Sequence, residues 1–160
     1  MKHSFFKLTL VLFLGIVACA PQTEQSTNSA SQTQSESSMN TFLSIFEIPA
    51  TDFDRAVNFY QALLDIPIEK VSFPGLDVGV FPYENQAVTG VIMKGEDYVP
   101  SATGVTIYLN GGENLQPILD KVEPNGGKIL VPKTPHADES GFFALFLDTE
   151  GNKIGLSSPQ

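Results

Sequence analysis

Very few side chains in this chain of 160 residues could act as a nucleophile or a metal ligand. Cys19 is the only cysteine, and His3 and His136 are the only histidines. Residues 1–18 have a basic start, an apolar run of about a dozen residues and a small residue before Cys19, which is the layout of a cleaved secretory signal. Once this segment leaves, His136 is the only imidazole, so a metal site with several histidines from one chain is excluded.

The residues around Cys19 resemble the lipobox of bacterial lipoproteins. The cysteine directly follows Ile16, Val17 and Ala18; in such proteins its thiol is acylated and the signal is cut before it. The resemblance implies a lipid anchor at Cys19, and several acyl chains hold a protein on a membrane where one would be marginal. Ala20 stands where an aspartate would resemble an inner-membrane retention signal. We therefore expect a lipid-anchored protein of the cell envelope, on the periplasmic face of the outer membrane if the cell has two membranes. The alternative is an ordinary signal peptide with an incidental cysteine.

Residues 19–41 are dominated by Gln, Ser, Thr and Asn. No apolar residue recurs there at a structural period, so this segment cannot bury enough apolar surface to offset its ordering entropy. We interpret it as a disordered tether between the lipidated cysteine and a domain at residues 42–160. The chain carries 18 acidic and 9 basic residues. Because an acidic surface repels phosphate, nucleic acid is not expected as a partner.

The domain shows one order of elements twice, in modules at about 42–95 and 103–158. Each begins with a strand-like run, continues with apolar residues at helical spacing, and ends with three short strand candidates. The first helical stripe comprises Phe53, Ala56, Val57, Tyr60, Leu63 and Leu64, and the second comprises Leu115, Ile118, Leu119 and Val122. One module alone would expose an apolar sheet face, whereas two can place their sheets together around a cleft.

Two sequence blocks resemble the vicinal oxygen chelate superfamily, which includes glyoxalase I, extradiol dioxygenases, fosfomycin-resistance proteins and bleomycin-binding proteins. One is Asp-x-x-Arg-Ala-x-x-Phe-Tyr from Asp52 to Tyr60, and the other is Asp-x-Glu-Gly-Asn from Asp148 to Asn152. The resemblance implies an α+β fold of paired βαβββ modules whose curved mixed sheets enclose a ligand cleft. It also implies dimerisation, so a homodimer is a candidate assembly.

The metal ligands that the resemblance implies are missing from the matching positions. The first position, seven residues before Asp52, holds Ile45, and the last, four residues after Gly151, holds Gly155. The other two fall near residues 89–91, which offer no carboxylate, and 104–106, which offer no imidazole. We therefore expect neither a metal nor another cofactor, and a metal-dependent lyase, epimerase or dioxygenase is disfavoured.

Side chains two residues apart on a strand share a face, so the positions of Ile45 and Gly155 point to further residues that would face the cleft. If Ile45 faces the cleft, Glu47 does too, as a polar anchor or acid/base; its alternative is an ion pair with a lysine at the open end of the strand. Thr106 and Tyr108 share a face and could donate hydrogen bonds to a ligand, or could serve packing and the sheet. The candidate ligand-binding residues are Ile45, Glu47, Thr106, Tyr108, Lys153, Gly155 and Ser157.

His136 lies in a Pro- and acid-containing loop between two strand candidates. It could shuttle protons or donate a hydrogen bond over the cleft, or it could be a solvated loop residue. Catalytic residues stay unassigned, with Glu47 and His136 as candidates. Three functions stay open: a metal-free module that binds a small molecule of unidentified kind, a glyoxalase I-related lyase or dioxygenase-like enzyme, and a structural or interaction domain. The missing ligands favour the first, so an enzyme is the lesser expectation.

Overall fold

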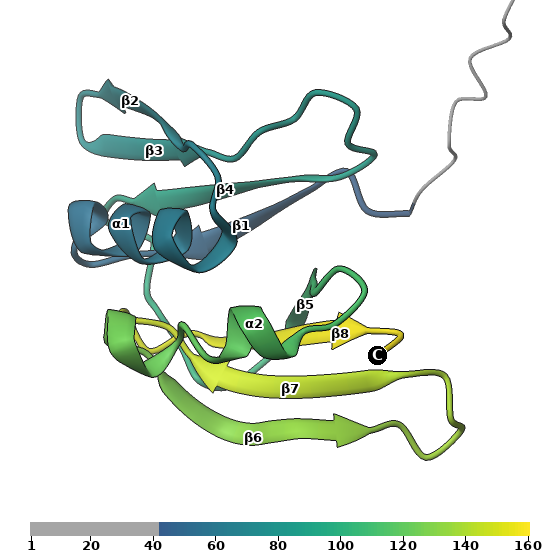
Figure 1. The fold of residues 1–160 in the computed structure, drawn as a ribbon. Helices are drawn as coiled ribbons and strands as arrows, with labels where there is room; N and C mark the ends of the chain where they lie inside the picture. The colour runs from purple at the N-terminus through teal and green to yellow at the C-terminus, as the bar shows by residue number, and fades with distance from the viewer. Residues whose placement is uncertain (1–41) are drawn as a thin grey trace, which may run out of the picture. The chain divides into compact units, whose positions relative to one another are not determined.

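The structure is a computed structural model that describes residues 42–160 (Figure 1). The signal-like segment at 1–18, Cys19 and the polar segment up to residue 41 lie outside the described residues. Lipidation and the tether therefore stay predictions. Among the described helices, none is long and apolar enough to cross a membrane.

The first module forms a four-stranded sheet with one long helix. Its elements are β1 (Ile45–Pro49), α1 (Phe53–Leu64), β2 (Glu69–Phe73), β3 (Leu76–Val80) and β4 (Thr89–Lys94). The strand order is β1-β4-β3-β2, in which β1 runs parallel to β4 and the other neighbours are antiparallel.

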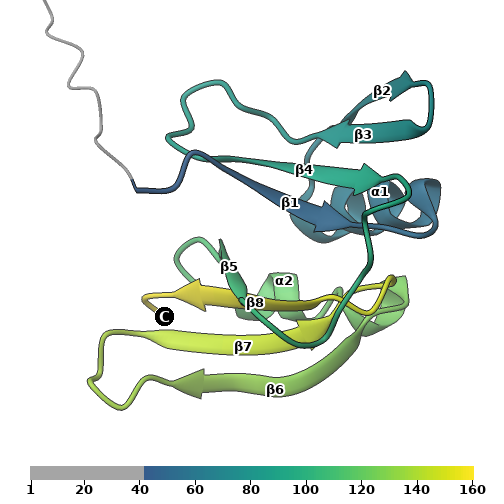
Figure 2. The same cartoon turned by 180° about the vertical axis from the view of Figure 1, so that it is seen from behind.

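The second module repeats this arrangement (Figure 2). Its elements are β5 (Ile107–Asn110), α2 (Gln116–Leu119), the 3-10 turn η1 (Glu123–Asn125), β6 (Lys128–Pro135), β7 (Phe142–Leu147) and β8 (Lys153–Ser158). The order is β5-β8-β7-β6, again with one parallel pair, β5 and β8. The predicted α+β fold of paired modules is thereby confirmed, and β1 and β5 are edge strands of their sheets.

Helix α1 forms where the sequence predicts it. The Asp52 side chain accepts the backbone N–H of Arg55 at 3.1 Å and so caps the first turn. The helix ends at Asp65, whose left-handed backbone (φ 55°) turns the chain away before Pro67. The predicted stripe faces inward, since its members Phe53, Ala56, Val57, Tyr60 and Leu63 are buried. The helix therefore covers one face of the first sheet.

The second helix is shorter than the apolar stripe at 115–122 predicts. Only Gln116–Leu119 is α-helical, and a 3-10 turn at Glu123–Asn125 follows. After Asp120 the backbone bonds tighten to the third residue back, from Lys121 to Ile118 and from Val122 to Leu119, and Pro124 has no N–H to resume the α-helical ladder. Leu115, Leu119 and Val122 are nevertheless fully buried, so the stripe still packs against the core.

One hydrophobic core joins the helix-facing sides of both modules. The ring of Phe59 on α1 lies 6.2 Å from that of Phe146 on β7, and Tyr60 lies 5.7 Å from Phe81 in the first module. The opposite faces of the sheets are more open, since Ile45 and Tyr108 are 48% and 47% exposed. The two modules therefore fold as one compact unit rather than as two independent ones.

Candidate functional site

A largely apolar cavity of about 580 Å³ lies between the two modules. Its apolar walls include Phe46, Leu64, Ile66, Phe81, Ile107 and Ile118. A volume in this range, with mostly hydrophobic and aromatic walls, is typical of sites for small organic ligands. The cavity is the part of the described structure best suited to hold one.

The cavity opens on a different face from the one that the sequence predicts. Phe46 lines it, and Phe46 alternates with Glu47, so it shares the helix-facing side of β1 with the buried Ile48. Ile45 and Glu47 point to the other side and are not among the lining residues. Glu47 therefore does not line the apolar cavity, and its role in a ligand site stays a prediction. Tyr108 does line it.

The aromatic wall depends on a glycine in the neighbouring strand. Phe46 pairs in register with Gly90 of β4. A Cβ atom on Gly90 would lie 2.5 Å from Cε2 of the Phe46 ring, so only glycine leaves room for the ring there. Phe46 then packs edge-on against Phe81, with ring centroids 6.1 Å apart. Both rings border the cavity.

The structure places three of the four implied metal positions on strands, at Ile45, residues 89–91 and Gly155, and the fourth, at residues 104–106, just before β5. Their side chains do not suit a divalent metal. Ile45 pairs with Thr89, and Gly155 pairs with Tyr108. Within residues 42–160 no group of three or more His, Cys, Asp or Glu side chains could hold a metal ion. The donor set thus does not fit the family metal, and we derive no step through it.

Glu47 lies in a separate, smaller hollow of about 160 Å³, which Lys153 and Ser101 also line. Its carboxylate interacts with the phenol of Tyr98. Partial desolvation raises the pKa of the Tyr98 phenol, and the Glu47 charge raises it further. Glu47 forms no ion pair with a lysine in the described part of the chain. Its partner is therefore a phenol, which neither sequence interpretation anticipated.

The remaining candidates are divided between places. His136 directly follows β6, and its backbone N–H donates to the carbonyl of Gly141 at 2.8 Å. The centroid of its ring lies 5.0 Å from that of the Phe143 ring. It is not among the residues that line the cavity. Thr106 precedes β5 and is half-buried. Ser157 and Tyr108 line a further hollow of about 410 Å³.

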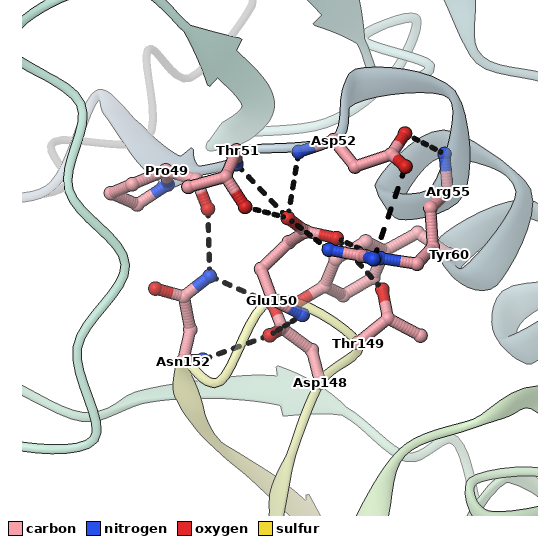
Figure 3. Close-up of polar contacts among 9 residues, drawn as sticks. All are labelled: Pro49, Thr51, Asp52, Arg55, Tyr60, Asp148, Thr149, Glu150 and Asn152. Atoms are coloured by element: carbon pink, nitrogen blue, oxygen red, sulfur yellow. Dashed lines mark hydrogen bonds and ion pairs between the residues drawn. The ribbon is translucent and has the colours of Figure 1, made fainter.

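The two sequence blocks of the resemblance meet in space through residues 88 to 98 positions apart (Figure 3). Asp148 is buried and accepts the Tyr60 hydroxyl at 2.8 Å. It also accepts the backbone N–H groups of Glu150 and Asn152. Burial and then the Asp148 charge raise the pKa of Tyr60 well above its usual range, so the phenol stays a donor. Asn152 adds a bond from Nδ2 to the carbonyl of Pro49 at 2.8 Å.

Glu150 completes this junction at the start of α1. Its carboxylate accepts the backbone N–H groups of Thr51 and Asp52, both at 2.9 Å, and Nε of Arg55 at 2.7 Å. Burial alone would raise its pKa, but these bonds outweigh it and lower the pKa from 4.5 to about 2. Figure 3 shows the carboxylate pointing at the helix N-terminus. The motif residues therefore join the turn between β7 and β8 to the N-terminus of α1, and they do not line the cavity.

The sequence missed most of the cavity wall. Phe46, Leu64, Phe81 and Ile118 carry the signature of core residues, because they alternate or repeat on the helix-facing side. Nothing in that pattern distinguishes a residue that packs against a neighbour from one that borders a void. The proximity of Phe46 and Gly90 across two strands is a tertiary fact.

Comparisons with known proteins agree on one family. A family model described as Glyoxalase/Bleomycin resistance protein/Dioxygenase superfamily matches residues 42–156. A glyoxylase-like domain-containing protein from Didymella fabae is 33% identical over 123 residues, covering 69% of this chain and 88% of the relative.

Solved structures share the fold at low identity. A glyoxalase/bleomycin resistance protein from Albidiferax ferrireducens T118 has a TM-score of 0.60 at 19% identity, covering 74% of this chain and 98% of its own. The fosfomycin resistance protein FosX from Listeria monocytogenes has a TM-score of 0.57 at 18% identity, covering 76% of this chain and 96% of its own. TnmS3, an antibiotic binding protein from Streptomyces sp. CB03234, has a TM-score of 0.57 at 16% identity, covering 75% of this chain and 97% of its own. Almost the whole length of each of these chains aligns with this chain, so each consists mainly of this fold.

Proposed function

We propose that this chain, which belongs to the Glyoxalase/Bleomycin resistance protein/Dioxygenase superfamily, binds a small organic molecule in the cavity between its modules without a metal. The observation that carries the proposal is the cavity of about 580 Å³ with its wall of Phe46 and Phe81. Burial of apolar ligand surface there would supply most of the binding free energy. An antibiotic binding protein with the same fold supports a binding role for this architecture.

The test uses residues 42–160 and a neutral apolar fluorophore, N-phenyl-1-naphthylamine. We expect saturable binding with one site per chain. Ala87 is exposed at the cavity wall, so Ala87→Trp should obstruct the entrance and weaken binding about tenfold or more without opening the core. Ala137→Trp places the same ring in the β6–β7 turn and should bind like the parent. Absence of saturable binding, or equal loss in both variants, would refute the cavity as a ligand site.

The second part of the proposal is the location. A lipid on Cys19 would hold the domain at the cell envelope, on the outer membrane where two membranes exist, so that the cavity samples molecules outside the cytoplasm. Cys19→Ser should abolish palmitate labelling and leave a soluble or unprocessed protein. Labelling that persists in this variant would contradict the anchor.

The main alternative is a glyoxalase I-related lyase or a dioxygenase-like enzyme. No specific observation in residues 42–160 favours it, since the donor positions hold Ile45 and Gly155. Glu47 and His136, the acid/base candidates from sequence, are not among the residues that line the cavity. A structural or interaction role is the third reading, and saturable ligand binding would argue against it.

A further inference from the structure

The apolar cavity shares a wall with a second, more polar hollow. Tyr108, Leu109 and Asn110 of β5 line both the cavity of about 580 Å³ and the hollow of about 410 Å³. Ser157 of β8 faces the second hollow and pairs in register with Asn110. Because β5 is an edge strand, its two faces border the two hollows. We call the group Tyr108, Asn110 and Ser157 the polar ledge.

Neither lining contains a charged side chain. This is unusual for the chain, in which 17% of residues are charged. The other two hollows do carry charges, with Asp77, Lys94 and Glu96 in one and Glu47 and Lys153 in the other. A charged group on a ligand in the apolar cavity would lose hydration without gaining a counter-charge, which disfavours its binding. The lining therefore selects against ions.

The polar ledge retains unused hydrogen-bonding capacity. Asn110 Oδ1 already accepts the N–H of Gly112 at 2.9 Å, so this side chain offers its amide N–H groups. The hydroxyls of Tyr108 and Ser157 have no hydrogen-bond partner within residues 42–160. The ledge thus supplies neutral donors, which match neutral oxygen acceptors such as hydroxyl, ether or carbonyl groups.

From this arrangement we propose that the ligand is an uncharged amphiphile, with an apolar body in the cavity and an oxygen-bearing end on Tyr108, Asn110 and Ser157. The inference rests on the proposed binding function and narrows it to one chemical class. The Tyr108 ring lies at the boundary, with its face toward apolar atoms and its hydroxyl available to polar ones. An apolar chain with a short polyol or ester end has the required character.

The test compares three six-carbon probes on residues 42–160 by calorimetry and by displacement of N-phenyl-1-naphthylamine. The probes are 1-O-hexylglycerol, hexanoate and hexylammonium, which share the apolar body and differ in charge. We expect hexylglycerol to bind about tenfold or more tightly than either ion, since one unpaired charge outweighs a neutral hydrogen bond. Equal binding of an ion, or failure of all three to displace the fluorophore, would overturn the inference.

Asn110→Asp provides the site-specific variant, because an aspartate keeps the acceptor for Gly112 and adds a charge to the ledge. It should weaken the binding of hexylglycerol and strengthen that of hexylammonium, each about fivefold or more. Asn125→Asp adds the same charge at the exposed last residue of η1 and should leave the binding of the three probes unchanged. If the fluorophore binds and the probes do not discriminate, only this inference fails. If the fluorophore itself does not bind, the proposed function fails with it.

Discussion

The ring of Tyr108 lies directly over the backbone of Gly155. The two residues pair in register across β5 and β8, and a Cβ atom on Gly155 would come within 2.7 Å of Cγ of the ring. Gly155 is the position where the family resemblance implies a metal-ligating carboxylate. The aromatic ring therefore occupies the space that such a carboxylate would need. The glycine at this position is thus required for the packing of the Tyr108 ring.

Gly155→Ala should destabilise residues 42–160 by about 1–3 kcal/mol, because the added methyl displaces the Tyr108 ring from a packed site. In a Tyr108→Ala background the same methyl has room, so its cost should be much smaller. Urea unfolding of the four proteins of this double-mutant cycle measures the coupling. An equal cost in both backgrounds would show that the ring does not depend on the glycine.

Glu150 should make the fold sensitive to acid. Its pKa is about 2 in the folded chain, against the ordinary value of 4.5 that applies when the chain is unfolded. Its contribution to the free energy of unfolding is therefore fully present above about pH 4.5 and is lost as the pH falls towards 2. The loss should reach about 3 kcal/mol at most. Glu150→Gln should lower stability at pH 7 and flatten the stability profile between these two pH values. The matched change Glu123→Gln, at an exposed turn, should leave the profile unchanged. A parent-like acid profile in Glu150→Gln would contradict the role of the carboxylate.

Purified residues 42–160 should contain no stoichiometric zinc, nickel, iron or manganese. The physical reason is the donor set, since Ile45 and Gly155 offer no ligand atoms and no cluster of three acidic, His or Cys side chains is present in the described residues. Elemental analysis by mass spectrometry measures the content, and added chelator should not move the melting temperature. One tightly held ion per chain with a chelator-sensitive fold would disprove this prediction.

Glu47→Gln should lower the pKa of Tyr98 towards its usual value, because the neighbouring charge that disfavours the phenolate is removed. Stability should change little, since Glu47 is exposed. Binding of the neutral fluorophore should be unaffected, because Glu47 does not line the apolar cavity. Site-resolved NMR titration of the tyrosines measures the shift, with Glu69→Gln at an exposed site of β2 as the control. A Glu47→Gln variant that lost fluorophore binding would return Glu47 to the ligand site.

The sequence alone determined the repeated order of elements, the inward stripe of α1 and the absence of metal-ligating residue types at Ile45 and Gly155. These follow from local rules: alternation with period two on strands, spacing of three and four on helices, and capping by Asp52. The shortening of the second helix was not readable from Pro124, because the α-helical part already ends at Leu119.

Only the tertiary structure decided where the cavity lies and what Glu150 and Tyr108 do. Phe46 and Gly90 are 44 positions apart, and Arg55 and Glu150 are 95 positions apart. A periodic pattern gives the face on which a side chain lies but not the neighbour that it meets, or whether a void remains between them. Pairing β1 with β4, and α1 with the turn after β7, fixed those neighbours. The cavity consequently opened on the helix-facing side of β1, and Glu47 was left on the other.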